Sequence, residues 1–281
     1  MANIKKTYEP DNSIKKGYFS LFGEIYRELK SNTWLTFQFF KRDFLAIYKQ
    51  SFIGVLWAFI IPLISVGTFV LLNRAGIFNI GTIKVPYAIY AVLGISIWQL
   101  FSTGLLSTSN SLVKAGSMII KINFSKKTLV IAAIGQALIS FLVQFLLVII
   151  LFFIYNYSPN LYILLTPILI IPIILFTLGF GFILSLLNGV FRDIGNILSV
   201  LITFLMFLTP VLYSTPTKGL MAVITKYNPL FYLITVPRDI ILFGESTNVL
   251  GFLISTIISI FVFVICIVIF HLTETRVAER I

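Results

Sequence analysis

The sequence predicts an all-α integral membrane protein with six transmembrane helices. Of its 281 residues, 58% are hydrophobic and only 11% are charged, and the mean hydropathy is +1.02. A soluble domain has a much higher share of charged residues and a lower mean hydropathy. Uncharged apolar runs, most long enough to cross about 30 Å of hydrocarbon, predict spans near residues 51–72, 85–107, 128–155, 162–187, 197–213 and 248–271.

An interfacial amphipathic helix is predicted over residues 33–50, directly before the first span. Its aromatic side chains recur at three- and four-residue intervals, with basic residues between them. Such a helix lies in the headgroup layer with its apolar face toward the lipid. The candidate interfacial residues are Trp34, Phe37, Lys41, Arg42, Phe44 and Tyr48.

The distribution of basic residues predicts the orientation of the chain. If the segments between spans are assigned alternately to two sides, one side carries 16 Lys and Arg residues and the other carries 5. The positive-inside rule then puts both termini in the cytoplasm. We therefore expect a cytoplasmic tail over 1–32, the interfacial helix over 33–50, a transmembrane domain over 51–273 and a cytoplasmic C-terminus over 274–281. The net charge of +11 follows this topology, so we do not expect a nucleic-acid partner.

The segment 214–247 differs from the other connections. It contains apolar pieces of eight to ten residues, separated by Pro216, Pro229 and Pro237. Each piece is too short to span, and pieces of this length are typical of helices that dip into one leaflet and return. We expect short re-entrant helices on the outer side between the fifth and sixth spans. An interfacial loop lying flat is the alternative.

Several residue patterns exclude particular chemistries. The chain contains no Gly-Lys pair and therefore no phosphate-binding P-loop, so ATP would have to be bound by another polypeptide. His271 is the only histidine and Cys266 the only cysteine, which argues against the usual His/Cys zinc clusters. We expect no metal or cofactor in this chain. No carboxylate lies in the middle of a predicted span, which argues against ion-coupled transport.

Polar and aromatic residues within and between the spans allow two interpretations each. Gln136, Ser140 and Gln144 share one face of the third span, where they either line a hydrated path or bond to neighbouring helices. Phe204 and Phe207 share a face of the fifth span with Val211, and Tyr213 lies at its outer end. These rings either contact sugars or belong to an ordinary aromatic belt.

Two Arg-Asp pairs are also open to two interpretations. Arg192 and Asp193 lie in a short cytoplasmic turn and are either solvated or part of a docking surface. Arg238 and Asp239 are either a snorkelling arginine followed by a helix-start aspartate, or part of a gate.

Six motifs occur in an order that is similar to a known family. They are KRDFLAIYKQSFIGVLWAFIIPL (41–63), YAIYAVLGISIWQLFSTGL (87–105), IIKINF (119–124), FRDIGNIL (191–198), TPVLYS (209–214) and NPLFYLITVPRDIIL (228–242). With them the chain resembles the membrane subunit of ABC-2-type exporters, in the branch that exports lipid-linked polysaccharides such as O antigen, capsule or teichoic acid. In that family IIKINF is commonly followed by proline, whereas Ser125 follows it here.

The resemblance implies a set of partners and roles. Two copies of the chain would pair around a channel in the bacterial cytoplasmic membrane. Two copies of an ATPase, which holds the ATP and Mg, would dock beneath, and the lipid anchor of the glycan would enter beside the interfacial helix. The implied coupling residues are Lys114, Lys121, Phe124, Arg192 and Asp193. Channel-lining candidates are Trp57, Trp98, Gln136, Gln144, Phe204, Phe207 and Tyr213. The implied outer gate contains Asn228, Pro229, Arg238 and Asp239.

Three other functions remain as alternatives. An ABC-2 exporter of a drug, haem or small lipid would have the same topology. A membrane-embedded enzyme acting on sugar-lipids would need clustered acidic or histidine residues at a membrane face, for which Asp239 and Glu245 are the nearest candidates. A membrane scaffold without transport activity would not explain the broken segment 214–247.

Overall fold

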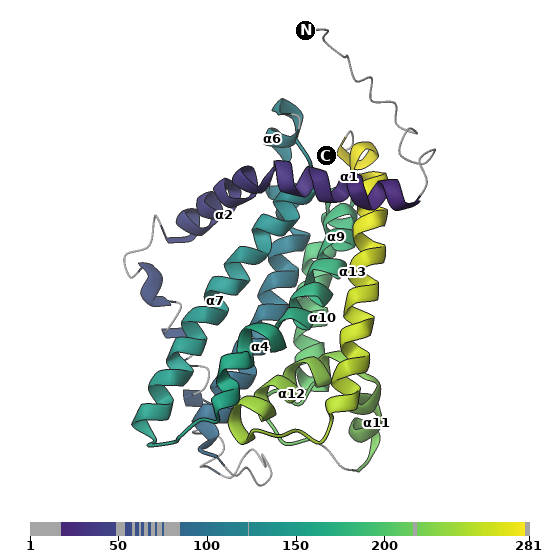
Figure 1. Ribbon diagram of the computed structural model, residues 1–281. Coiled ribbons are helices and arrows are strands. Elements are labelled where there is room, and N and C mark those ends of the chain that lie inside the picture. Colours follow the sequence, from purple (N-terminus) through teal and green to yellow (C-terminus); the bar gives the residue numbers. More distant parts are fainter. Residues whose placement is uncertain are drawn as a thin grey trace, which may run out of the picture.

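The computed structural model describes residues 18–48, 85–122, 124–215 and 218–278, together with scattered residues between 54 and 75. Every regular element in these ranges is a helix (Figure 1). In chain order they are α1 (Tyr18–Ser31), α2 (Thr33–Tyr48), the 3₁₀ helix η1 (Gly54–Leu56), α4 (Tyr87–Ser109), α5 (Ser111–Lys114), α6 (Gly116–Lys121), α7 (Lys127–Ile154), the 3₁₀ helix η2 (Leu161–Leu165), α8 (Thr166–Leu169), α9 (Ile171–Val190), α10 (Ile194–Leu208), α11 (Leu220–Tyr227), α12 (Pro229–Phe243) and α13 (Val249–Ala278).

Helix α4 occupies the centre of the bundle. It packs against α7, α9, α10 and α12, and 83% of its most apolar window is buried, compared with 28% for α13. Small residues on α4 allow its neighbours to approach closely. A Cβ atom at Gly104 would lie 2.9 Å from Thr177 Cγ2 on α9 and 3.4 Å from the Ala137 side chain on α7. Helix α4 is therefore enclosed by protein, whereas α13 presents much of its apolar surface outward.

Four helical segments among the described residues are long and apolar enough to cross a membrane. They are α4, α7, the Leu161–Val190 segment and the Val249–Glu274 part of α13. They correspond to the second, third, fourth and sixth predicted spans, so the chain is a multi-pass membrane protein. The first predicted span, 51–72, falls mostly outside the described residues.

The fourth span is interrupted rather than continuous. It consists of η2, α8 and α9, and each of the two α-helices has a proline, Pro167 or Pro172, in its first turn. A proline lacks the backbone N–H that continues a helix and fits best at a helix start. Each of these two helices therefore begins at its proline.

The fifth predicted span, 197–213, is shorter in the structure. Helix α10 has 15 residues and ends at Leu208, which corresponds to about 22 Å at about 1.5 Å per residue, less than the thickness of the hydrocarbon core. It ends there because Thr209 is extended, with φ −115° and ψ 123°, as favoured for a residue before proline, here Pro210. Six complete crossings are thus not established within the described part of the chain.

The bundle has two distinct ends. Helices α1, α2 and α6 and the last turns of α13 lie at one end, and α11 and α12 lie at the other (Figure 1). We call these the α1 end and the α12 end. This arrangement is compatible with the prediction that both termini lie on one side of the membrane, and the identity of that side stays a prediction.

Part of the predicted N-terminal tail is a helix. Helix α1 falls within residues 1–32, for which the sequence indicated no structure, and it lies across the α1 end of the bundle. Its Leu21 and Ile25 side chains are buried, while Phe22 and Tyr26 are exposed. Buried and exposed residues thus alternate at helical spacing, as expected for an amphipathic helix that packs on one side. Residues 1–17 lie outside the described ranges.

Cysteine labelling tests this arrangement of the ends. Cys266→Ser gives a chain without cysteine, into which Ser31→Cys or Thr247→Cys is introduced, at exposed positions near the α1 end and the α12 end. We expect a membrane-impermeant maleimide to reach the two positions from opposite sides of sealed vesicles, with Ser31→Cys reacting from the cytoplasmic side. Labelling of both from one side would contradict the fold.

Candidate functional site

A buried arginine organises the α12 end. The Arg238 side chain, on α12, is only 1% exposed. Its Nη1 donates hydrogen bonds to the backbone oxygens of Pro210 (3.2 Å) and Val211 (3.0 Å), just after the end of α10. Its guanidinium carbon lies 3.9 Å from the centroid of the Tyr90 ring on α4, within the range of a cation–π interaction. One side chain therefore connects α12 to α4 and to the segment that follows α10.

The contact between α4 and the segment after α10 depends on a glycine. A Cβ atom at Gly94 would lie 2.5 Å from the Val211 carbonyl oxygen and 3.5 Å from Arg238 Nη1. Only a residue without a side chain allows this approach. Glycine at position 94 therefore leaves room for the Val211 carbonyl group, which accepts a hydrogen bond from Arg238.

Asp239 completes the charge balance next to Arg238. One of its carboxylate oxygens lies 3.4 Å from Arg238 Nε. Burial raises the pKa of the Asp239 carboxyl, although the neighbouring guanidinium acts in the opposite direction. The snorkelling and helix-start interpretations of this pair are wrong, because both residues lie inside α12 and the arginine is buried. Pro237, expected to separate two pieces, also lies inside α12.

The start of α12 is capped by a predicted gate residue. Asn228 Oδ1 accepts a hydrogen bond from the Leu230 N–H (3.0 Å), and its Nδ2 donates to Thr209 Oγ1 (2.9 Å). Pro229 occupies the first turn, where its missing N–H has no cost. The four predicted gate residues thus lie together at the α12 end. A gating role stays a prediction.

The polar residues predicted on α7 bond to α4. Gln144 Nε2 donates to Gln99 Oε1, and Ser107 Oγ donates to Gln136 Oε1 (3.3 Å). Gln144 is buried, as is Trp98 on α4. Of the two interpretations for this stripe, bonding to a neighbouring helix is the one observed. Within the single chain, Trp98 and Gln144 belong to the helix interface and not to an open path.

The aromatic residues of α10 face outward. Phe204 and Phe207 are each 64% exposed, and Tyr213 donates from its hydroxyl to the Phe207 carbonyl oxygen (2.7 Å). Val211 does not share this face as expected, because it lies beyond α10 and is buried. Trp57, in the sparsely described region, is 42% exposed. Tyr213 is half-buried. The predicted lining role of Phe204, Phe207, Tyr213 and Trp57 is compatible with these exposures and stays a prediction.

Most predicted coupling residues are exposed at the α1 end. Lys114 and Lys121 lie at the ends of α5 and α6, and Arg192 and Asp193 form the turn before α10. Phe124 differs, because its ring packs against Phe39 of α2 with 5.3 Å between centroids. Phe124 therefore connects the α6–α7 loop to α2 and is mostly buried.

An asparagine that the sequence did not single out holds the α9–α10 turn. Asn188 is buried, and its Nδ2 donates to the Ser109 carbonyl oxygen (3.1 Å) and to Asn110 Oδ1 (3.0 Å). Its Oδ1 accepts from the Gly195 N–H (3.1 Å). The end of α4 and the start of α10 are thus both bonded to α9. The signal in the sequence is an amide in the last turn of an apolar run, which is rare without a partner.

A cluster of charged side chains fastens α1 to the bundle. Lys127, at the start of α7, is fully buried. Its ammonium lies 2.8 Å from Glu28 Oε2 of α1 and also pairs with Glu274 Oε1 of α13. The other Glu274 oxygen accepts from the Lys126 N–H (3.1 Å). A buried charge is tolerated only when paired in this way, so the two carboxylates stabilise Lys127 where three helices meet.

Histidine 271 lies beside the same cluster. Its Nδ1 is 3.6 Å from Glu274 Oε1 and 3.9 Å from Glu28 Oε2, and its Nε2 is 4.0 Å from Glu24 Oε2. Possible metal-binding atoms of Glu28, His271 and Glu274 lie within 4.8 Å of one another, a convergence that a search for His and Cys motifs misses. Because the Lys127 ammonium already pairs with both carboxylates, we interpret the cluster as an ion-pair junction.

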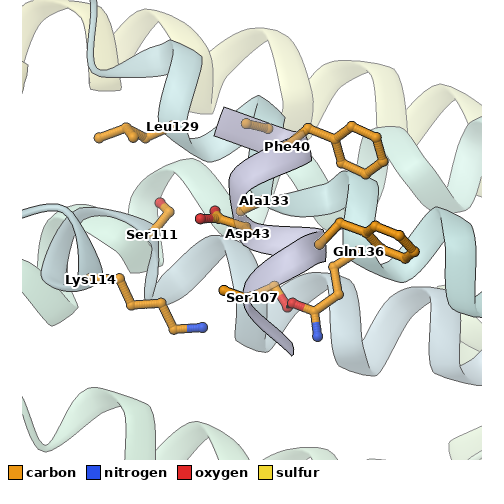
Figure 2. Close-up of a pocket in the computed structure, with 11 residues that line it drawn as sticks. Phe40, Asp43, Ser107, Ser111, Lys114, Leu129, Ala133 and Gln136 are labelled. Carbon is orange, nitrogen blue, oxygen red and sulfur yellow. The ribbon is translucent and has the colours of Figure 1, made fainter. Parts of the chain in front are cut away.

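The predicted interfacial residues all lie on α2, and their position at a membrane surface stays a prediction. Trp34 and Phe37 are 72% and 58% exposed. Arg42 pairs with Asp43 (2.7 Å) and lies over the Phe39 ring, and the adjacent Lys41 is exposed. Phe44 lines a pocket between α2 and the bundle. Figure 2 shows this pocket in close-up. The side chain of Tyr48 lies outside the described residues.

Substitution of Arg238 tests its role at the α12 end. We expect Arg238→Met to lower the midpoint of thermal unfolding, because it removes the donor to two carbonyls and leaves Asp239 unpaired, at a cost of about 1–3 kcal/mol. Arg238→Lys should recover only part, since an ammonium cannot reproduce the planar stacking on Tyr90. The exposed Arg192→Met is the matched control. Equal midpoints for both methionine variants would contradict the assigned role.

Substitution of Lys127 tests the junction at the α1 end. Lys127→Met leaves two carboxylates without their cation, at a cost of about 3–5 kcal/mol in the free energy of unfolding. We expect this loss to lower the midpoint of thermal unfolding. Adding Glu274→Gln should restore part of this loss, because one uncompensated charge is removed. Lys126→Met is the control, since only the backbone of Lys126 contacts Glu274. A Lys127→Met variant as stable as this control would rule out the junction.

Comparison with known proteins places this architecture in a family. A profile of the family described as "ABC-2 type transporter" matches residues 35–242, from the start of α2 to the end of α12. The O-antigen export system permease protein RfbA of Myxococcus xanthus is 28% identical over 218 residues, covering 75% of this chain and 81% of that protein. Two proteins of the same name from Klebsiella pneumoniae are 26% identical over 233 residues and 27% identical over 246 residues, covering 79% and 85% of this chain and 88% and 91% of those proteins.

Proposed function

We propose that this chain, which belongs to the ABC-2 type transporter family, is the membrane subunit of an ATP-driven exporter of lipid-linked polysaccharide. The substrate class would be O antigen, capsule or teichoic acid, exported across the bacterial cytoplasmic membrane. The observation that carries the proposal is that relatives named as O-antigen export permeases align with 75% to 85% of the chain. The family match also includes both the interfacial helix α2 and the α12 end.

The energy for transport would come from a separate ATPase. The chain has no P-loop sequence, and ABC-2 family membership implies an ABC ATPase partner. We propose that two ATPase copies dock at the α1 end. The exposed Lys114, Lys121 and Arg192, with the adjacent Asp193, offer charged groups for that contact. Asn188 bonds the start of α10, which follows the Arg192–Asp193 turn, to the end of α4, so force on the turn would reach the central helix.

The substrate path would lie between two copies of the chain. The exposed Phe204 and Phe207 rings of α10 supply a face without formal charge. Aromatic faces can stack on successive sugar rings, and repeated weak contacts suit a polymer that must slide. Because Trp98 and Gln144 are buried between helices, the α10 face is the better supported part of the proposed lining.

The α11–α12 segment would act as the outer gate. Arg238 bonds α12 to the carbonyl groups that follow α10 and stacks on Tyr90 of α4. A movement of α10 would therefore be transmitted to α12 through these bonds. The lipid anchor would enter at the opposite end, beside the exposed aromatic residues of α2.

Transport measurements distinguish this proposal from the alternatives. The chain should be co-expressed and purified with a candidate ABC ATPase and reconstituted into proteoliposomes. We expect ATP hydrolysis that depends on this subunit and ATP-dependent movement of a polyprenyl-linked glycan across the bilayer. The control complex contains an ATPase whose P-loop lysine is replaced. Failure to associate with any ATPase would defeat the proposal, and transport of only a drug, haem or small lipid would favour the rival exporter.

A further inference from the structure

A pocket with both polar and apolar lining residues lies between α2 and the bundle, outside the proposed substrate path. Its volume is about 280 Å³, just below the roughly 300–1,000 Å³ found for small-molecule sites. It is partly open. Helices α2, α4, α5 and α7 contribute its lining residues, which are Phe40, Asp43, Phe44, Ala46, Ser107, Ser111, Lys114, Leu129, Ala132, Ala133 and Gln136.

The position of the pocket corresponds to the headgroup layer of a membrane. Ser107 is near the last residue of the α4 span, and Ser111 and Lys114 lie just beyond it. On α7 the lining begins at Leu129, in the first turn of that span, and reaches Gln136. The pocket therefore extends from the membrane surface about two to three turns toward the hydrocarbon at 3.6 residues per turn, beneath an amphipathic helix.

The pocket lining includes one cation, Lys114, and one anion, Asp43. In the part of the chain that the structure describes, the Lys114 ammonium has no ion pair or hydrogen bond. Asp43 pairs with Arg42 at the surface (2.7 Å) and also lines the pocket. In Figure 2 the polar ends of Asp43, Ser111 and Lys114 lie on one side of the pocket and the Phe40 ring lies on the other. One cation and one anion facing a common space suit a ligand that carries both charges.

Further donors and an apolar wall complete the arrangement. Gln136 uses its Oε1 to accept from Ser107 (3.3 Å), and within the described residues its Nε2 is not used in a hydrogen bond. Phe40 and Phe44 stack with 6.2 Å between centroids. Together with Leu129, these rings provide the apolar surface that the glycerol and first methylenes of a lipid need.

We propose that this pocket binds the zwitterionic headgroup of a bilayer phospholipid with a primary amine, of the phosphatidylethanolamine type. The phosphate lies at Lys114 with Gln136 Nε2, and the ammonium lies at Asp43. Within the described residues Arg42 contacts only Oδ1 of Asp43, so Oδ2 can accept from the lipid ammonium. An anionic headgroup without an amine would leave Oδ2 unused and add a repulsive charge. The bound lipid joins α2 to the ends of α4 and α7.

Native mass spectrometry of the full-length chain in detergent tests the proposal. Phosphatidylethanolamine, phosphatidylglycerol and a polyprenyl phosphate are titrated separately and in competition. We expect one phosphatidylethanolamine per chain to be retained about tenfold more tightly than phosphatidylglycerol, the ratio for one charge-assisted hydrogen bond. Equal retention of the two phospholipids would overturn the proposal. Preferred retention of polyprenyl phosphate would also overturn it and would assign the pocket to the transported substrate instead.

Two variants assign the binding to this pocket. Lys114→Gln should weaken phosphatidylethanolamine retention about tenfold, by the same reasoning, and Asp43→Asn should remove the preference over phosphatidylglycerol. Lys121→Gln, an exposed lysine that does not line the pocket, is the control and should retain lipid like the unchanged chain. If Lys114→Gln behaves like this control, the site is elsewhere. The lipid comparison on the unchanged chain stands even if a variant folds poorly.

Discussion

A buried guanidinium needs acceptors on several sides, and the α12 end is arranged to supply them. Helix α10 ends at Leu208, before Pro210, so the carbonyl groups of Pro210 and Val211 are directed to Arg238 rather than into a helix. In a membrane protein each such carbonyl would be costly to leave unpaired. The absence of a side chain at Gly94 lets these carbonyls approach α4. The early end of α10, the close approach to α4 and the orientation of α12 therefore all serve to provide Arg238 with hydrogen-bond acceptors.

The opposite end of the bundle solves the same problem with whole charges. Lys127 begins a long apolar helix and is fully buried, and it is stable there because Glu28 and Glu274 reach it from two other helices. At the α9–α10 turn, the uncharged Asn188 side chain connects neighbouring helices through hydrogen bonds in a similar way. The turn proposed to contact an ATPase is therefore connected to the end of α4 by buried polar bonds.

Hydrophobic runs in the sequence predict the long helices well, because length and lack of charge are properties of each segment alone. The spans predicted at 85–107, 128–155 and 248–271 match α4, α7 and α13 in this way. Contacts between distant segments are not accessible from a single sequence. Nothing in residues 18–31 shows that Glu28 meets Lys127, and a lone Arg238 near a membrane end is easily taken for a snorkelling side chain. Gln136 and Gln144 were ambiguous for the same reason, since one helix does not reveal its neighbour.

The junction at Lys127 also sets an order of events during synthesis of the protein. Glu28 precedes its partner Lys127 by 99 residues, and Glu274 follows Lys127 by 147 residues. The ribosome releases α13 only after α1 and α7 have been made, so α1 is synthesised before the junction that holds it can form. Closure of this junction is therefore a late step of assembly in the bilayer, after the other long helices are available.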